Sequence, residues 1–177
     1  HFGNSVSISG NYAVVGAHSE DNSMGVDAGS VYFFQRSEGV WGDEQKLVDI
    51  NGDDVDAFGR SVALYGRTAI VGADQHDDES GDNTGSATIV KYWNNTWLPS
   101  AYLKAPDREA LDYFGFSVSI SADTVVIGAF NGDGMAADSG AAYVFQKTSE
   151  DDTTPVTGWD LLAKLIASDG AAGDKFG

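Results

Sequence analysis

The stretch FGFSVSISADTVVIGA, residues 114–129, decides the fold because the chain repeats it. Equivalent stretches are FGNSVSISGNYAVVGA at residues 2–17 and FGRSVALYGRTAIVGA at residues 58–73, and a further Phe-Gly stands at positions 176 and 177. Phe-Gly therefore recurs at intervals of 56, 56 and 62 residues. A fixed period near 50 residues, without helical periodicity inside it, predicts an array of identical β units.

Each repeat predicts four short strands. In the first repeat, residues 5–9 alternate apolar with small polar side chains, Gly10-Asn11 forms a two-residue hairpin turn, and residues 12–17 are apolar on both faces. Residues 30–36 then predict an aromatic-rich third strand, and Trp41 to Leu47 a more polar outer strand. The later repeats predict strands at 61–64, 68–73, 85–92 and 97–103, and at 117–121, 124–129, 140–147 and 159–165.

These units predict an all-β fold of four-stranded antiparallel blades, as in a β-propeller, with blades at residues 1–57, 58–113 and 114–177. Propellers have about 4 to 8 blades, so three blades form part of a larger or assembled ring. Further blades of the same parent chain, or another copy of it, would complete that ring. The third repeat has seven extra residues around positions 150–157, which predict a longer surface loop between its third and fourth strands.

Aromatic side chains recur at two positions of the repeat. We expect Phe2, Phe58 and Phe114 to fill the gaps between neighbouring blades. The tryptophans that begin each fourth strand should pack between blades, because large aromatic side chains contribute most to such cores; they are Trp41, Trp97 and Trp159.

The repeated Phe-Gly and the Gly-Ala at residues 16, 72 and 128 resemble the FG-GAP repeat family, whose repeats form the propeller blades of integrin α-subunits and of many secreted or cell-surface proteins. The resemblance covers the whole chain and implies a propeller fold and an extracellular location. The family's proline after Gly-Ala is replaced here by His18, Asp74 and Phe130. The family's calcium loop between the first two strands is also absent, because that connection has only two residues in each repeat.

The charge is strongly acidic and unevenly distributed. The chain has 27 acidic and 10 basic residues, a net charge of −17, which argues against nucleic acid and anionic membranes as partners. We expect no insertion into a membrane. Nineteen of the acidic residues lie in six loops that should share one face of the blades, where only Lys104, Arg108 and Lys175 are basic. These six loops, called the acidic loop end below, are residues 18–28, 48–57, 74–84, 104–113, 130–139 and 166–175.

Three positions within these loops carry aspartate in most or all repeats. Carboxylates gathered on one rim repel one another, and hard oxygen ligands on loops suit Ca²⁺. We therefore predict calcium at the acidic loop end, held by Asp21, Asp27, Asp56, Asp77, Asp112, Asp133, Asp138 and Asp174. The alternative is that these aspartates cap turns by accepting hydrogen bonds from nearby backbone amides.

No constellation for catalysis stands out. His1, His18 and His76 are isolated in the sequence and are interpreted as solvated loop residues rather than zinc ligands, and the serines recur as strand residues. Asn94-Asn95-Thr96 is an acceptor for N-glycosylation in a predicted hairpin turn, with Asn94 as the modified residue.

The sequence as a whole predicts a non-enzymatic, extracellular or cell-surface binding or adhesion module. Its acidic, calcium-braced loops would recognise a protein or glycan ligand. Two alternatives remain open: a structural self-assembly or spacer module, and a propeller-type glycan lyase or hydrolase.

Overall fold

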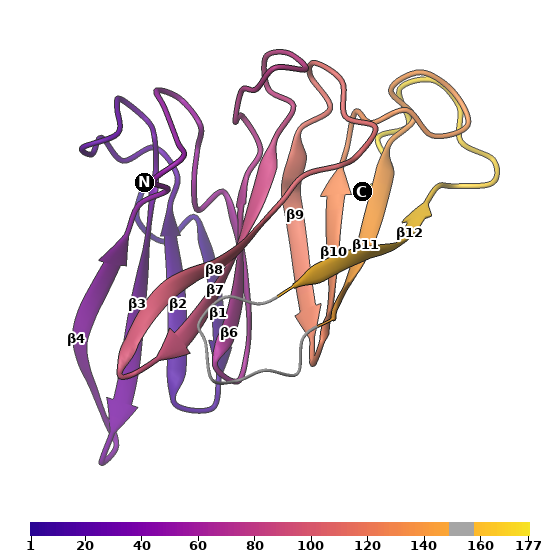
Figure 1. Ribbon diagram of the computed structural model, residues 1–177. Helices are drawn as coiled ribbons and strands as arrows, with labels where there is room; N and C mark the ends of the chain where they lie inside the picture. The colour runs from indigo at the N-terminus through magenta and orange to yellow at the C-terminus, as the bar shows by residue number, and fades with distance from the viewer. Residues whose placement is uncertain (149–157) are drawn as a thin grey trace.

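The computed structural model describes residues 1–148 and 158–177, and its strands form three four-stranded antiparallel sheets (Figure 1). The all-β prediction is therefore confirmed. The bounds are β1 Ser5–Ser9, β2 Tyr12–Ala17, β3 Ser30–Ser37, β4 Val40–Leu47, β5 Ser61–Tyr65, β6 Thr68–Ala73, β7 Ser86–Trp93, β8 Thr96–Leu103, β9 Phe114–Ser121, β10 Thr124–Ala129, β11 Ala141–Lys147 and β12 Trp159–Leu165.

Each sheet is a simple meander, and we call the sheets blade 1 (β1 to β4), blade 2 (β5 to β8) and blade 3 (β9 to β12). The first strands β1, β5 and β9 contact one another in succession, so the inner edges of the blades lie side by side (Figure 1). The described residues form three blades and do not close a ring. They include no helix that is long and apolar enough to cross a membrane.

The predicted strands agree with the observed ones except at their ends. The largest difference is β9, which begins at Phe114, three residues before the predicted start. The register between β9 and β10 shifts at Gly128/Ala129, so Phe114 pairs with Ala129 across an irregularity that β1 and β5 lack. The predicted loop around residues 150–157 lies outside the described residues.

Each Phe-Gly joins its blade to the preceding one through the backbone. The amide of Phe58 donates a hydrogen bond to the carbonyl of Ala28 at 3.0 Å, and that of Phe114 to the carbonyl of Thr84 at 3.1 Å. The hydroxyl of Ser5 donates to the carbonyl of Gly59 at 2.7 Å. The first residues of one blade are thus hydrogen-bonded to the blade before it.

Glycine is required where these backbones meet. A Cβ at Gly72, in the Gly-Ala of blade 2, would overlap the carbonyl oxygen of Gly115, and Gly16 has the same relation to Gly59. Gly59 and Gly115 also have positive φ angles of 90° and 95°, which favour glycine. Phe-Gly and Gly-Ala are therefore the two halves of one contact, made between successive blades.

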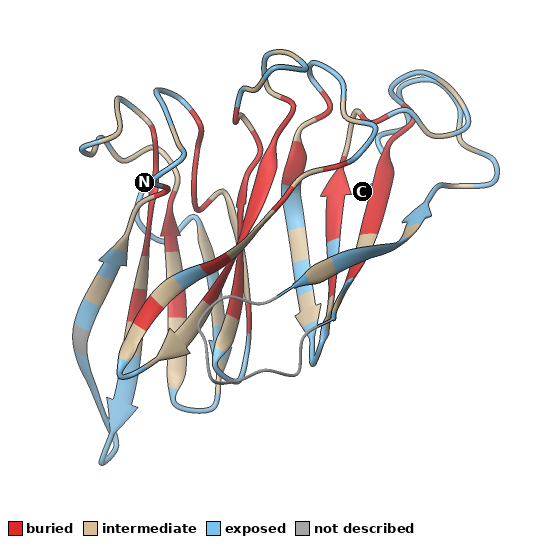
Figure 2. Cartoon of the chain, in the orientation of Figure 1, coloured by how far each residue is buried: buried red, intermediate tan, exposed pale blue. Residues whose placement is uncertain are grey.

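Two apolar clusters fill the junctions between blades. Phe33 of blade 1 stacks on Trp97 of blade 2 with ring centroids 4.3 Å apart, in a cluster that includes the buried Phe58. Phe114 lies in the cluster between blades 2 and 3, where its ring meets Tyr143 and Phe145 edge-on. Figure 2 shows the buried residues concentrated in the strands that face a neighbouring blade, whereas the outer strands β4 and β12 and the hairpin turns are largely exposed.

The predicted packing is wrong at blade 1. Phe58 and Phe114 are buried as expected, but Phe2 is 62% exposed, because no preceding blade packs against it in this structure. Trp97 is buried, whereas Trp41 is 40% exposed for the same reason. Trp159 is partly buried against the cluster between blades 2 and 3. The repeated aromatic positions are therefore covered only where two blades meet.

Candidate binding surface at the acidic loop end

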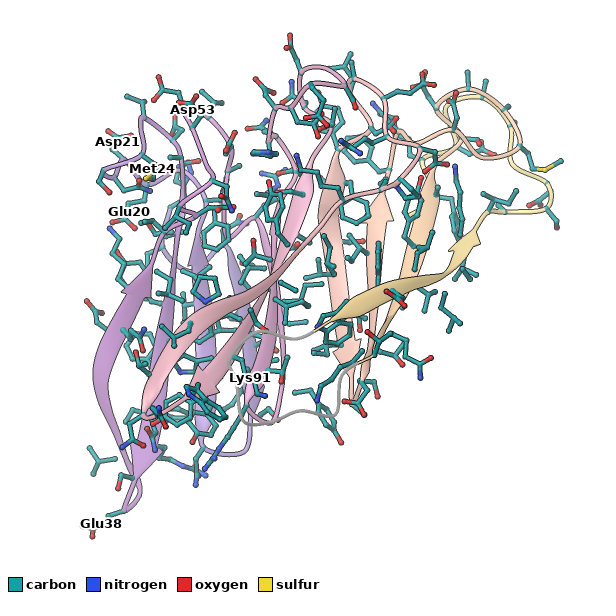
Figure 3. The ribbon with its side chains drawn as sticks, viewed as in Figure 1. Glu20, Asp21, Met24, Glu38, Asp53 and Lys91 are labelled. Atoms are coloured by element: carbon teal, nitrogen blue, oxygen red, sulfur yellow. The ribbon has the colours of Figure 1, made fainter. Side chains whose placement is uncertain are left out.

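The six acidic loops lie together at one end of the blades, and the two-residue hairpin turns lie at the other (Figure 1). In Figure 3, Glu20, Asp21 and Asp53 are seen at the loop end, and Glu38 projects from the opposite end. The fold therefore brings together 19 of the 27 acidic residues. Many of them are exposed, including Asp82, Glu109 and Asp169.

The first recurring aspartate closes the loop between the second and third strands of each blade. Asp21 Oδ1 accepts a hydrogen bond from the amide of Asp27 at 3.0 Å. The pairs Asp77 with Asn83 and Asp133 with Asp138 repeat it at 2.6 and 2.9 Å. The donating residues have positive φ angles of 51°, 53° and 52°, so the carboxylate holds a sharp left-handed bend.

The recurring aspartate before Phe-Gly is also a turn cap. Asp56 Oδ2 accepts from the amide of Asp53 at 2.7 Å, three residues earlier. Asp112 accepts from Glu109, and Asp174 from Ala171, both at 2.8 Å. Six of the eight predicted calcium ligands therefore accept a hydrogen bond from a backbone amide of their own loop. The other two, Asp27 and Asp138, donate their backbone amides to such hydrogen bonds.

This arrangement does not form a ready calcium site. In residues 1–148 and 158–177, no group of three or more His, Cys, Asp or Glu side chains is placed to hold a metal ion. The predicted ligands come to the same end of the molecule, but they are distributed among separate turns. Calcium binding stays a prediction, and the function proposed below does not depend on it.

Several cations of the loop end are engaged internally. Asp78 accepts hydrogen bonds from Lys104 at 2.8 Å and from Arg108 at 2.6 Å. Burial favours the neutral acid, but these hydrogen bonds outweigh it and hold the pKa of Asp78 well below its usual value. Lys175 lies over the ring of Phe130, 4.8 Å from its centroid. The three basic residues therefore contact neighbouring side chains within the loop end and leave many of its carboxylates exposed.

A buried polar pair lies where the acidic loops of blades 1 and 2 meet. His76 Nδ1 is 3.0 Å from Asp56 Oδ2, and both side chains are buried. The interpretation of His76 as a solvated loop residue is therefore wrong. Sequence reasoning missed the pair because its two members come from different loops, the connection into blade 2 and the loop after β6. Only the spatial meeting of these loops shows the contact.

A pocket of about 200 Å³ opens beside this pair, between blades 1 and 2. Leu47, Phe58 and Val90 supply apolar walls, and Asp49, Thr88 and Tyr102 supply polar ones. Asp49 Oδ2, Thr88 Oγ1 and the Tyr102 hydroxyl are buried without a hydrogen-bond partner. Burial also raises the pKa of Asp49. The corresponding space between blades 2 and 3 contains the larger Tyr143 and Phe145.

The inner edges of blades 2 and 3 differ at the position after Gly-Ala. Asp74 is buried, with Arg60 Nε 3.8 Å from its Oδ2. Burial raises the pKa of Asp74 to about 6, although the charge of Arg60 opposes the shift. In blade 3 the same position is Phe130, whose ring packs against Tyr113 and Phe116.

The predicted glycosylation site lies at the end opposite the acidic loops. Asn94 and Asn95 form the exposed turn between β7 and β8, with φ angles of 46° and 64°. Positive φ at both residues is the geometry of the two-residue hairpin turn that asparagine favours. Glycosylation itself remains a prediction.

Comparison with known proteins supplies the family. A search of curated proteins found no match. The model of the FG-GAP repeat matches residues 1–34, 41–90 and 97–145, one segment for each repeat. These segments cover more than half of the chain and contain each Phe-Gly and Gly-Ala whose contact is described above, and the chain belongs to the FG-GAP repeat family.

Proposed function

We propose that this FG-GAP module is a non-enzymatic binding or adhesion module that recognises its ligand through the acidic loop end. The observation that carries the proposal is the placement of 19 of 27 acidic residues in loops at one end of the blades, against three basic residues. Such a surface attracts cationic groups over several ångströms and disfavours anionic ones. We therefore expect a protein ligand with a basic surface, and a glycan is the other class to test.

The loops are suited to recognition because they are closed by internal hydrogen bonds. Each capping aspartate fixes its own turn, so the exposed carboxylates between the caps are carried by a defined backbone. A surface ordered before binding loses less conformational entropy when the ligand arrives. In this proposal the recurring aspartates hold the turns of the loops in place, and the exposed acidic side chains that do not cap a turn contact the ligand.

We further propose that the module acts at the cell surface or outside the cell. The family resemblance to secreted propellers supports this location, and so does the acceptor Asn94 in an exposed turn far from the acidic loops. A glycan on Asn94 would leave the proposed binding surface open. Mass spectrometry of protein from the native source tests the modification.

The binding proposal is tested with a triple variant and a matched control. Asp82→Asn, Glu109→Gln and Asp169→Asn remove three exposed charges of the loop end whose side chains do not cap its turns. Glu38→Gln, Glu44→Gln and Asp123→Asn remove three exposed charges elsewhere. An array of basic and neutral matrix proteins and glycans identifies a ligand, and calorimetry then compares its affinity for both variants.

We expect the loop-end variant to lose about tenfold in affinity and to show a weaker dependence on salt, because opposite charges across an interface contribute to both. The control has the same net charge and should bind as the parent does. Equal losses in the two variants would show that only the net charge matters, and the proposed surface would then be wrong.

The same calorimetry tests calcium. Titration of the free protein with CaCl₂, and of the ligand in CaCl₂ against EDTA, reports whether the ion binds and whether it contributes to recognition. Because the capping aspartates already accept amides, we expect the protein to fold and bind in EDTA. Loss of folding in EDTA would show that calcium holds the loops and that the caps alone are not sufficient.

A further inference from the structure

The pocket between blades 1 and 2 lies where the next junction carries a tyrosine. Thr88 and Val90 form part of its wall, and the residues at these positions in blade 3 are Tyr143 and Phe145. Blade 1 also has a tyrosine, Tyr32, at the position of Thr88. Of the three blades, blade 2 therefore lacks the aromatic ring that the other two carry at this position.

The aligned positions at the junction of blades 2 and 3 are filled. Tyr143 is 1% exposed and belongs to an apolar cluster that includes Leu103, Ala105, Phe114 and Phe145. The residues that align with this set all line the pocket, and they are Leu47, Asp49, Phe58, Thr88 and Val90. The two junctions have matched walls, so the pocket is the space that a tyrosine ring fills in the other junction.

The polar groups of the two junctions differ together with the ring. Tyr143 donates a hydrogen bond to Asp107 at 2.8 Å. The position of Ala105 is Asp49 in the pocket, and its Oδ2 is buried without a hydrogen-bond partner. Thr88 Oγ1 is unpartnered as well, and both side chains are 6% exposed. Because buried polar atoms in proteins normally have partners, the pocket lacks a group that donates to Asp49.

The size and the opening of the pocket suit a single ring. An apolar cavity of about 150 Å³ accommodates one benzene molecule, and this pocket measures about 200 Å³. Ile50 lines it and is 71% exposed, so the pocket can be reached from solvent. In the aligned junction, Phe114 meets the ring of Tyr143 edge-on with centroids 5.5 Å apart. Phe58 can make the same contact with a ring in the pocket.

We propose that the pocket binds a small molecule that has one phenol-sized ring and a hydroxyl group. The ring takes the place that Tyr143 has in the next junction and packs against Phe58. The hydroxyl donates to Asp49 Oδ2 and lies among the polar groups of Thr88 and Tyr102. This site is separate from the binding surface formed by the exposed acids of the loop end, and neither requires the other.

Three probes of similar shape separate the ring from its donor. p-Cresol has the ring and hydroxyl of a tyrosine side chain, toluene lacks the hydroxyl, and 4-methylbenzoate has a carboxylate instead. Amide shifts of Asn51, Thr88 and Tyr102 in NMR titrations of the 177-residue chain report binding. We expect p-cresol to bind at least about tenfold more tightly than toluene, because it donates a hydrogen bond to a carboxylate. 4-Methylbenzoate should not bind, because its charge would face Asp49.

Two variants take their residues from the aligned positions of the other junction. Thr88→Tyr supplies the missing ring from the chain itself and should abolish binding of p-cresol and of toluene. Asp49→Ala removes the acceptor and should weaken p-cresol by about tenfold, whereas the affinity for toluene should not fall. Asp123→Ala is the control, because Asp123 is an exposed acid in the turn between β9 and β10. It should leave both affinities unchanged.

Circular dichroism checks that the variants are folded, and Asp49→Ala with its two probes tests the site even if Thr88→Tyr is not. Equal affinity for p-cresol and toluene in the parent would overturn the proposal, and so would p-cresol binding that persists in folded Thr88→Tyr. A parent that does not bind p-cresol would show that water alone satisfies Asp49 and Thr88, and would overturn the proposal as well.

Discussion

The junction of blades 1 and 2 and the junction of blades 2 and 3 share one backbone arrangement but differ in the side chains that fill it. Both are held by a Phe-Gly hydrogen-bonded to the preceding blade. Between blades 2 and 3, Tyr143 and Phe145 pack around Phe114. Between blades 1 and 2, the aligned residues are Thr88 and Val90, and a pocket of about 200 Å³ is left.

This difference shows that the repeated motif determines how blades meet and leaves the interior of the contact free to vary. A side chain in place of either glycine, or the loss of the hydrogen bond that the Phe amide donates, would break the backbone contact. The residues around the Phe ring can be aromatic or small. Polar groups such as Asp49 and Tyr102 occur where the side chains leave a pocket between the blades. Substitutions at the two junctions should therefore differ in their effect on stability.

Truncating the two buried phenylalanines gives the largest expected effect. Phe114→Ala should lower the free energy of unfolding by about 4 kcal/mol, within the usual range for a buried Phe. Phe58→Ala should cost about 1 kcal/mol less, because Phe58 already lines a pocket, whereas Phe114 packs against the rings of Tyr143 and Phe145. Urea unfolding of both variants measures the difference. A larger loss for Phe58→Ala would show that the pocket is closed in solution.

The residue after Gly-Ala is titratable in blade 2 and apolar in blade 3, so substitutions at this position should differ in how their effect on stability depends on pH. The folded-state pKa of Asp74, about 6, lies above the ordinary value of 3.8. The folded protein therefore binds more protons than the unfolded chain between these values, and the contribution of Asp74 to stability falls as pH rises from about 4 to 6. Asp74→Asn should thus stabilise the protein by about 2 to 3 kcal/mol above pH 7 and have little effect below pH 4.

Thermal unfolding of the parent and of Asp74→Asn across pH 3 to 8 tests this sign. The aligned Phe130 of blade 3 has no titratable group, so Phe130→Leu serves as a control whose effect should not depend on pH. A destabilising effect of Asp74→Asn at pH 8 would mean that the Arg60 contact outweighs burial.

The smallest expected effects have opposite signs at one aligned position. Thr88→Val removes a buried hydroxyl that has no partner and should stabilise the protein by about 1 kcal/mol. Tyr143→Phe removes the hydrogen bond that Tyr143 donates to Asp107 at 2.8 Å and should destabilise it by about 1 kcal/mol. Chemical denaturation of the two variants checks both signs. The same sign for both would show that the two hydroxyls have similar partners in solution.

The strands and their grouping into blades could be predicted from sequence, because alternation, two-residue turns and a fixed period are local patterns. The role of the aspartates could not be predicted in the same way. A carboxylate that caps a turn and one that binds calcium share the same residue type and loop, and only the direction of the amides of Asp27, Asn83 and Asp138 distinguishes them. That direction depends on backbone φ angles, which the residue names do not specify.

Contacts between repeats were also beyond sequence reasoning. Asp56 and His76 are 20 residues apart and lie in loops that meet only when blades 1 and 2 pack. The exposure of Phe2 has a similar origin, because the motif alone does not show whether a preceding blade covers it. The period predicted the units, and the packing of neighbouring units decided which residues are buried.

Residue-resolved hydrogen exchange by NMR tests most directly whether Phe-Gly joins each blade to the one before it. The amides of Phe58 and Phe114 donate to Ala28 and Thr84, so we predict that they exchange as slowly as amides in the central strands β6 and β10. The amide of Phe2, which has no preceding blade to donate to in this structure, should exchange as in an unstructured peptide. Rapid exchange at Phe58 and Phe114 in the folded protein would contradict this account of the fold.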